Sequence, residues 1–271
     1  MTDRYAKMFS ALAERHEGAF VPFSVAGDPD PATSLEIFLT LAKEGADALE
    51  VGFPFSDPVA DGPTIQKADM RALSSKVRIK DAWEILGTVR ERFPRLPIGL
   101  LVYANLVEVS GHNAFYAKAF DVGIDSVLVA DVPTVEAPPY ADCAERHGVA
   151  PVLIATPNCT EQHLKEIARL CKGYTYVVTR TGVTGSDRAV HTEHNEFISK
   201  LLSYGAPPCL IGFGISTPDH VRNVLKSGAA GAICGSAVVQ IVEKHAHDVK
   251  ALLPALKDFI TPMKAATRNE R

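Results

Sequence analysis

The sequence predicts an α/β fold, a closed (β/α)8 barrel of the TIM type with an extra helix at each end of the chain. Short apolar runs of strand length alternate along the chain with longer amphipathic stretches. The runs are hydrophobic at nearly every position, as in parallel strands that are buried on both faces. Eight such runs occur, and the distance between successive runs leaves room for a crossover helix each time.

The expected strands begin after a short N-terminal segment and continue almost to the end of the chain. Their ranges are 20–25, 48–52, 98–102, 126–130, 151–155, 174–178, 209–212 and 231–234. An open doubly wound sheet is the alternative fold. Such a sheet usually has fewer strands and carries a GxGxxG turn after the first one, where this chain reads VAGDPDP. We therefore favour the barrel.

Helices are expected in the segments between these runs, with one more before the first strand and one after the last. Their ranges are 2–15, 31–44, 80–93, 113–122, 135–147, 161–171, 193–203, 218–226 and 248–266. Several end in glycine, which tolerates the left-handed conformation of a helix C-terminus. These glycines are Gly45, Gly123, Gly148, Gly173, Gly205 and Gly228. Because no linker interrupts the pattern, residues 1–271 are expected to form a single domain.

The composition is that of an ordinary folded protein, and it narrows the range of possible functions. The 271 residues are 46% hydrophobic and carry a net charge of −4, which disfavours a nucleic-acid-binding role. No apolar run reaches the roughly 18 residues of a membrane span, and residues 1–16 lack the apolar core of a secretory signal. The five cysteines are scattered without CxxC spacing, so we expect reduced thiols and a cytoplasmic location.

The second expected strand contains a carboxylate, Glu50, among apolar residues. An ionised carboxylate inside a barrel costs several kcal/mol unless it is paired. Glu50 is therefore either paired or solvent-facing, or a general acid–base whose pKa is raised by its apolar setting. Asp57 and Asp61 follow in a loop rich in Gly and Pro, where each also suits a turn. Carboxylates in unlike environments at one barrel mouth favour the acid–base interpretation.

Two further regions suit ligand binding at the carboxyl ends of the strands. The loop 179–187 (TRTGVTGSD) is long and polar, and fits either a lid or a plain surface loop. Glycine-rich turns follow the last two expected strands, at 212–216 (GFGIS) and 234–237 (CGSA). Backbone N–H groups and a helix N-terminus at such turns predict a phosphate site, although Gly235-Ser236 also fits a simple helix cap. No HxH or HExxH spacing occurs, so no metal site is expected.

Taken together, these segments resemble the tryptophan synthase alpha subunit family. The matching stretches are LEVGFPFSDPVADGPTIQ (49–66), YANLV (103–107), DSVLVADVP (125–133), YTYVVTRTGVTG (174–185), GFGIS (212–216) and GAAGAICGSAVV (228–239). The resemblance extends from residue 20 to the final helix. It implies a (β/α)8 barrel that cleaves indole-3-glycerol phosphate into indole and glyceraldehyde 3-phosphate, a carbon–carbon lyase reaction of retro-aldol type in tryptophan biosynthesis.

The resemblance also implies roles for individual residues. Glu50 and Asp61 would be catalytic. Asp61 would hold the indole N–H and stabilise positive charge on the ring, while Glu50 would protonate indole C3 and take the proton of the adjacent glycerol hydroxyl. The implied indole pocket, whose residues equally fit plain barrel filling, comprises Phe23, Leu101, Tyr103, Leu128, Ile154 and Phe213. Tyr176 would lie near the glycerol moiety, and Thr184 would meet Asp61 on loop closure. The implied phosphate ligands are Gly185, Gly214, Gly235 and Ser236.

The resemblance further implies a partner, a beta subunit that receives indole through a tunnel within an α2β2 heterotetramer. The beta subunit uses pyridoxal phosphate, so no cofactor is expected in this chain. The implied docking residues are Asp57, Pro58, Asn105, Asp131 and Pro133. Three features depart from the family pattern and bear on affinity for the partner: Phe53 beside the docking loop, the segment 108–112 (EVSGH) and the tail from 267.

Three other functions stay open at this point. They are a stand-alone indole-releasing lyase, a catalytically silent partner of a beta subunit, and another phosphate-handling barrel such as an isomerase. Glu50 and Asp61 argue against the silent partner, because binding alone does not require a buried carboxylate. The ADGPTIQ loop argues against the isomerase, which has no need of it. Co-purification with a beta chain separates the stand-alone lyase from the alpha subunit.

Overall fold

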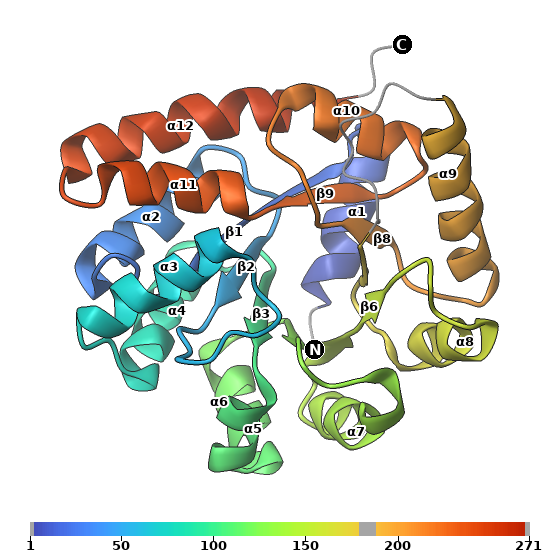
Figure 1. Ribbon diagram of the computed structural model, residues 1–271, viewed down its shortest axis with the longest axis horizontal. Coiled ribbons are helices and arrows are strands. Elements are labelled where there is room, and N and C mark those ends of the chain that lie inside the picture. Colours follow the sequence, from blue (N-terminus) through green and yellow to red (C-terminus); the bar gives the residue numbers. More distant parts are fainter. Residues whose placement is uncertain (1–2, 179–187, 269–271) are drawn as a thin grey trace.

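The computed structural model describes residues 3–178 and 188–268, and its strands form one barrel. All neighbouring strands are parallel, in the order β5-β4-β3-β2-β1-β9-β8-β7-β6, and helices surround them (Figure 1). The two ends of this order, β5 and β6, are consecutive in the chain and separated only by Leu153. The chain therefore closes the sheet on itself, and the predicted (β/α)8 barrel is confirmed.

The strands match the expected ranges closely, with one difference. They are β1 (Ala19–Val25), β2 (Leu49–Gly52), β3 (Ile98–Val102), β4 (Ser126–Val129), β5 (Ala150–Val152), β6 (Ile154–Ala155), β7 (Thr175–Val177), β8 (Cys209–Ile211) and β9 (Gly231–Cys234). The expected fifth strand, 151–155, is divided at Leu153. There the backbone N–H points to the Cys171 sulfur at 3.0 Å, while the carbonyl accepts from Tyr176 N–H at 3.1 Å. The chain thus changes its pairing partner from β4 to β7 at this residue.

The helices include two that the sequence pattern did not indicate, α3 and α5. The full set is α1 (Arg4–Glu14), α2 (Pro31–Lys43), α3 (Pro63–Ser74), α4 (Ile79–Arg92), α5 (Ala104–Ser110), α6 (His112–Val122), η1 (Thr134–Glu136), α7 (Pro138–Arg146), α8 (Glu161–Leu170), α9 (Arg188–Ser203), α10 (Pro218–Lys226), α11 (Ser236–His245) and α12 (Val249–Ala265). The expected helix 135–147 is divided into η1 and α7. Pro138 and Pro139 lack the N–H that a continuous helix needs, so a new helix begins there.

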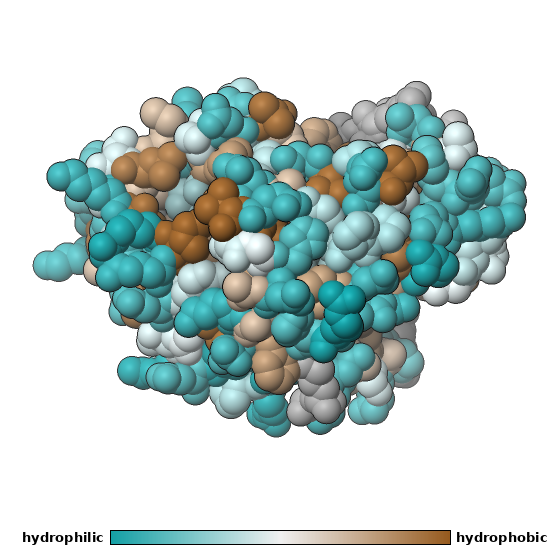
Figure 2. Space-filling model, turned by 90° about the horizontal axis from the view of Figure 1, so that it is seen from below, coloured by the Kyte–Doolittle hydropathy of each residue, from teal (hydrophilic) through white to brown (hydrophobic). Residues whose placement is uncertain are grey.

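The helix ends and the burial pattern follow from the sequence. All six glycines expected at helix C-termini have positive φ, between 72° and 124°. Strands β1, β2 and β9 are buried at every residue, as expected for strands covered on both faces. On the face shown in Figure 2, hydrophilic residues cover most of the surface and apolar residues stand in small groups. Within 3–178 and 188–268, no helix is both long enough and apolar enough to span a membrane.

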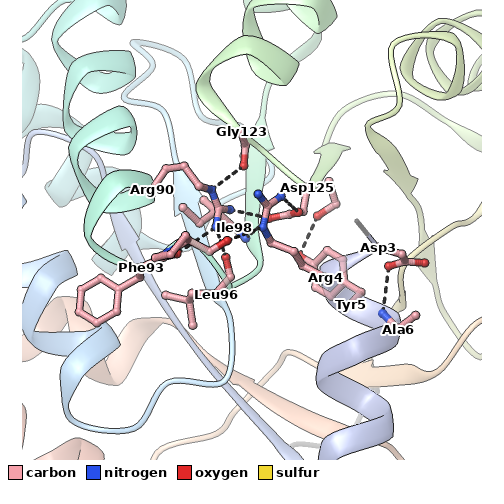
Figure 3. A network of polar contacts seen from close by, with 12 residues as sticks. Asp3, Arg4, Tyr5, Ala6, Arg90, Phe93, Leu96, Ile98, Gly123 and Asp125 are labelled. Atoms are coloured by element: carbon pink, nitrogen blue, oxygen red, sulfur yellow. Dashed lines mark hydrogen bonds and ion pairs between the residues drawn. The ribbon is translucent and has the colours of Figure 1, made fainter. Parts of the chain in front are cut away.

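Helix α1 is attached to the amino ends of the strands by an ion-pair network (Figure 3). Asp125, which directly precedes β4, lies 2.8 Å from Arg4 of α1 and 2.7 Å from Arg90 of α4. It also accepts the Ile98 backbone N–H at 2.8 Å. Arg90 donates to the carbonyls of Phe93, Leu96 and Gly123. The network holds α1 beneath the barrel, opposite the carboxyl ends of the strands.

Replacing Asp125 with alanine is expected to lower the free energy of unfolding by about 3–5 kcal/mol. The change leaves the Arg90 guanidinium, whose side chain is only 11% exposed, without its carboxylate, and the Ile98 N–H without its acceptor. Urea unfolding measures the loss. Arg4→Ala is the matched control and should cost less, because the Arg4 side chain is 25% exposed. A loss below about 1 kcal/mol in Asp125→Ala, the value of a surface pair, would contradict the prediction.

Candidate active site

Glu50 lies inside the barrel, on β2. It is 2% exposed, and its Oε1 accepts the hydroxyl hydrogen of Tyr174, next to β7, at 3.0 Å. No ion pair between described residues includes it. Burial raises the pKa of Glu50 to about 7, the Tyr174 hydrogen bond opposes this rise, and the Asp61 charge adds to it. In the described part of the chain, then, Glu50 is neither salt-bridged nor solvent-facing. Its pKa suits both giving and taking a proton near neutral pH.

Asp61 lies in the loop between β2 and α3, at the same end of the barrel. Its Oδ2 accepts the Tyr103 hydroxyl hydrogen at 2.6 Å, and its backbone carbonyl accepts from Gln66 Nε2 at 2.9 Å. The Tyr103 oxygen also accepts the Ala60 backbone N–H at 3.0 Å. Burial raises the pKa of Asp61, and the Tyr103 hydrogen bond lowers it. The two carboxylates therefore have different partners and different degrees of burial, as separate acid–base roles require.

Most of the expected indole-pocket residues line the barrel interior. Phe23, Tyr103 and Leu128 are buried, and Leu101 and Ile154 are partly buried residues packed against the clusters that contain Phe23 and Leu128. Tyr176, which is expected near the glycerol moiety, is buried as well. The Tyr176 hydroxyl donates to the Gly212 carbonyl at 3.0 Å. Phe213 differs from the rest, because its ring stands at the rim after β8 and is 58% exposed. Tyr103 does more than line a wall, since it also holds Asp61.

The predicted phosphate site lies at the turns after β8 and β9. Gly214 has a φ of +76°, which favours glycine. Gly235 is the N-cap residue of α11, as the alternative of a simple helix cap has it, and no side-chain hydrogen bond caps that helix. The N–H groups of the first turn of α11, which begins at Ser236, are thus available for an anion. Thr184 and Gly185 fall outside the described residues.

The residues expected to meet a partner lie at the surface, in the segments that follow β2, β3 and β4; Asn105 is on α5 and the others are on loops. Asp57, Asn105, Asp131 and Pro133 are exposed, and Pro58 is half-buried. Asp131 accepts the Ala104 N–H at 2.7 Å and so connects the loop after β4 with the start of α5. Large apolar side chains are exposed in the same region: Val59 is 81%, Val135 66% and Met70 60% exposed. The region therefore offers an apolar surface with polar residues among it.

The structure shows where two of the three departures from the family pattern lie. Phe53 is buried and packs edge-on against Trp83, with ring centroids 4.7 Å apart, so it belongs to the core rather than to the docking surface. In the segment 108–112, His112 and Tyr140 both contact the Glu108 carboxylate. Glu108 and His112 lie on α5 and α6, close to Asn105 along the chain, and Tyr140 lies on α7.

Sequence reasoning missed two polar residues near the carboxylates. Tyr174 reads as an ordinary strand aromatic, and only the three-dimensional fold reveals that its hydroxyl reaches Glu50. Asp69 is 3% exposed on α3. A signal for it existed, because Asp69 shares a helical face with Ile65, Ala68 and Ala72, the buried residues of α3. The Gly- and Pro-rich loop predicted up to residue 66 masks this pattern, because α3 already begins at Pro63. Among described residues, no group of three or more His, Cys, Asp or Glu could hold a metal ion.

The closed barrel, with the buried Glu50 and with Asp61 at the carboxyl ends of its strands, is the architecture of a barrel enzyme. A family model described as "Tryptophan synthase alpha chain" matches residues 9–268. The chain therefore belongs to the tryptophan synthase alpha chain family, whose members are carbon–carbon lyases.

Individual relatives agree with this assignment over the whole chain. The tryptophan synthase alpha chain of Sodalis glossinidius is 54% identical over 266 residues, which cover 98% of this chain and 99% of the relative. Among solved structures, a tryptophan synthase alpha chain from Legionella pneumophila has a TM-score of 0.89 at 26% identity, covering 98% of both chains. A chain of the tryptophan synthase α2β2 complex from Pyrococcus furiosus has a TM-score of 0.83 at 32% identity, covering 92% of this chain and 99% of that one.

Proposed function

We propose that this chain cleaves indole-3-glycerol phosphate into indole and glyceraldehyde 3-phosphate as the alpha subunit of a tryptophan synthase. The observation that carries the proposal is Glu50, which is buried in the barrel with a pKa of about 7 and lies at the same mouth as Asp61. Family membership supports the identity of the substrate.

In the proposed mechanism, one carboxyl group moves both protons. Protonated Glu50 delivers its proton to indole C3, which turns the ring into an indolenine. Asp61 accepts the ring N–H and stabilises the positive charge that develops there. Ionised Glu50 then takes the proton of the adjacent glycerol hydroxyl, the carbon–carbon bond breaks, and its electron pair returns to the ring. Indole and the aldehyde leave, and Glu50 is again protonated.

The remaining residues would bind the two ends of the substrate. The apolar interior around Phe23, Leu101, Leu128 and Ile154 suits a flat ring, and Tyr176 is proposed to lie near the glycerol moiety. For the phosphate we propose Gly214, Gly235 and Ser236, on the strength of the α11 N-terminus and the glycine turn. Gly185 and Thr184 keep their proposed roles as a phosphate ligand and a lid residue.

A beta subunit is the proposed partner, and pyridoxal phosphate is proposed to belong to it. The apolar side chains of Val59, Met70 and Val135 support docking at the surface that also carries Asp57 and Pro133. The similar Pyrococcus furiosus chain comes from a structure of a tryptophan synthase α2β2 complex. This supports the same assembly for the present chain. We propose a cytoplasmic location, which the five unpaired cysteine thiols support.

Steady-state indole release from indole-3-glycerol phosphate tests the proposal. The pure chain is assayed alone and then with a cognate beta subunit. We expect slow turnover alone and a large rise with the partner. Equal, fast turnover in both assays would replace the proposal with a stand-alone lyase. Absence of turnover in both would overturn it in favour of a silent partner or another phosphate substrate.

A further inference from the structure

Arg71, in the last turn of α3, has no role in the mechanism above, yet it connects three elements around the barrel mouth. Its Nε and Nη2 donate to the two carboxylate oxygens of Asp28 at 2.8 Å and 2.7 Å. Asp28 lies in the loop after β1 and is fully buried. On the other side, Arg71 Nη1 lies 3.8 Å from Glu243 Oε1 of α11, and Lys67 Nζ of α3 lies 3.2 Å from the same oxygen. Arg71 therefore ties α3 both to the end of β1 and to α11.

An apolar cluster joins the same three elements, and α3 lies beside α11 (Figure 1). Its members include Phe23 and Val25 of β1, Ile65, Ala68 and Ala72 of α3, and Val239 of α11. Apolar contacts are non-directional, so they hold the elements together without fixing one orientation. A guanidinium that meets both oxygens of a carboxylate does fix an orientation. The Arg71 pair thus adds the defined geometry that the apolar cluster lacks.

Each of the connected elements carries one part of the proposed substrate site. Gln66, in the first turn of α3, donates from Nε2 to the Asp61 carbonyl at 2.9 Å, so α3 supports the Asp61 loop. The N-terminus of α11, at Ser236, is the proposed phosphate site. A helix is a rigid support, so a tie in its last turns also fixes where its first turn lies. Arg71 is therefore in a position to set how far Asp61 lies from the phosphate site.

We propose that Arg71 is a positioning residue, which fixes the separation between Asp61 and the N-terminus of α11 so that both ends of one substrate molecule are held at once. The proposal rests on the proposed roles of Asp61 and of the phosphate site. A misplacement of about an ångström costs up to about a hundredfold in rate. A ring and a phosphate that bind as separate molecules can each adjust to a shifted site, whereas the two ends of one molecule cannot. Arg71 should therefore matter for the intact substrate and little for its pieces.

The test compares Arg71→Lys with the wild type, on the pure chain because the beta subunit would itself take up indole. Lysine keeps a positive charge beside Asp28 but lacks the planar fork that meets both carboxylate oxygens. Three quantities are measured: kcat/KM for indole release, the Kd of indole and the Kd of inorganic phosphate. We expect kcat/KM to fall about tenfold, while each Kd stays within about twofold of the wild type.

Arg169→Lys is the matched control. Arg169 donates to both carboxylate oxygens of Glu166, at 3.0 Å and 2.7 Å, but this pair lies on the surface of α8, where the Arg169 side chain is 61% exposed. The control should leave all three quantities unchanged. It separates the loss of a two-fold hydrogen-bonded pair as such from the loss of this pair at the barrel mouth.

Glu243→Lys is a second variant that leaves Arg71 and Asp28 paired. It turns the attraction between α11 and the two cations of α3 into repulsion, at a side chain that is 36% exposed. We expect kcat/KM to fall about fivefold with each Kd again within about twofold, because the two helices move apart while each part of the site stays intact. This variant decides the matter if Arg71→Lys does not fold.

Two results would overturn the proposal. One is a kcat/KM within twofold of the wild type in either folded variant. The other is a loss of indole or phosphate affinity as large as the loss in kcat/KM, which would mean that Arg71 supports only one part of the site. If the wild type releases no indole, the proposed function fails separately. The Kd of intact indole-3-glycerol phosphate, which is then not consumed, takes the place of kcat/KM in the same comparison.

Discussion

Replacing Glu50 with glutamine should lower kcat for indole release by about a hundredfold or more, because an amide can neither deliver nor accept the proton that the reaction moves. Glutamine keeps the size of the side chain, and its amide oxygen can still accept the Tyr174 hydroxyl hydrogen. The fold and the indole pocket should therefore be unchanged. Steady-state kinetics with the beta subunit present measure the effect, and KM should change much less than kcat.

The stability of the same variant supplies its control. Folding raises the pKa of Glu50 from 4.5 to about 7, so the folded state resists ionisation. Between these two values the unfolded chain binds fewer protons than the folded one, and the free energy of unfolding falls as the pH rises. Glutamine removes this fall, so the variant should gain stability relative to the wild type from pH 4.5 to pH 7. Activity within tenfold of the wild type would refute the proposed role. A marked loss of stability at neutral pH would point to a structural role instead.

The fold could be predicted because the signals for a parallel barrel are local. Strands covered on both faces must be apolar at nearly every position, as β1 and β9 are. Glycines at helix ends mark where several of the helices stop. The division of one strand at Leu153 could not be predicted, because it depends on the sulfur of Cys171, eighteen positions away, and on a partner strand chosen only when the barrel closes.

The site could be predicted only in part, for a similar reason. Glu50 stands out because a carboxylate is unusual in an apolar strand, and Asp61 stands out through its loop and the family resemblance. Their partners do not stand out. Tyr174 lies 124 positions from Glu50, and Tyr103 lies 42 positions from Asp61. An aromatic strand residue has the same appearance whether its hydroxyl meets a carboxylate or a carbonyl, so closure of the barrel decides these pairings.

Asp61→Asn is the second change from which we expect a large loss of activity. An asparagine can still accept the Tyr103 hydroxyl hydrogen, and its side-chain amide has nearly the same shape, so the loop should keep its anchor. What it lacks is the negative charge that stabilises the developing positive charge on the indole ring. Removal of one such electrostatic contact typically costs about a hundredfold to a thousandfold in kcat. We expect a loss in this range, with the circular dichroism spectrum and thermal midpoint close to those of the wild type.

Tyr103→Phe separates charge from position at Asp61. It leaves the Asp61 carboxylate in place but removes the hydroxyl that holds both Asp61 and the Ala60 N–H. If the negative charge of Asp61 stabilises the transition state, the decrease in kcat must be larger for Asp61→Asn than for Tyr103→Phe. The reason is that a misplaced charge still stabilises the transition state in part. If Tyr103→Phe loses as much as Asp61→Asn, the position of the loop is what matters. A fully active, folded Asp61→Asn would remove Asp61 from the mechanism and leave Glu50 as the only catalytic carboxylate.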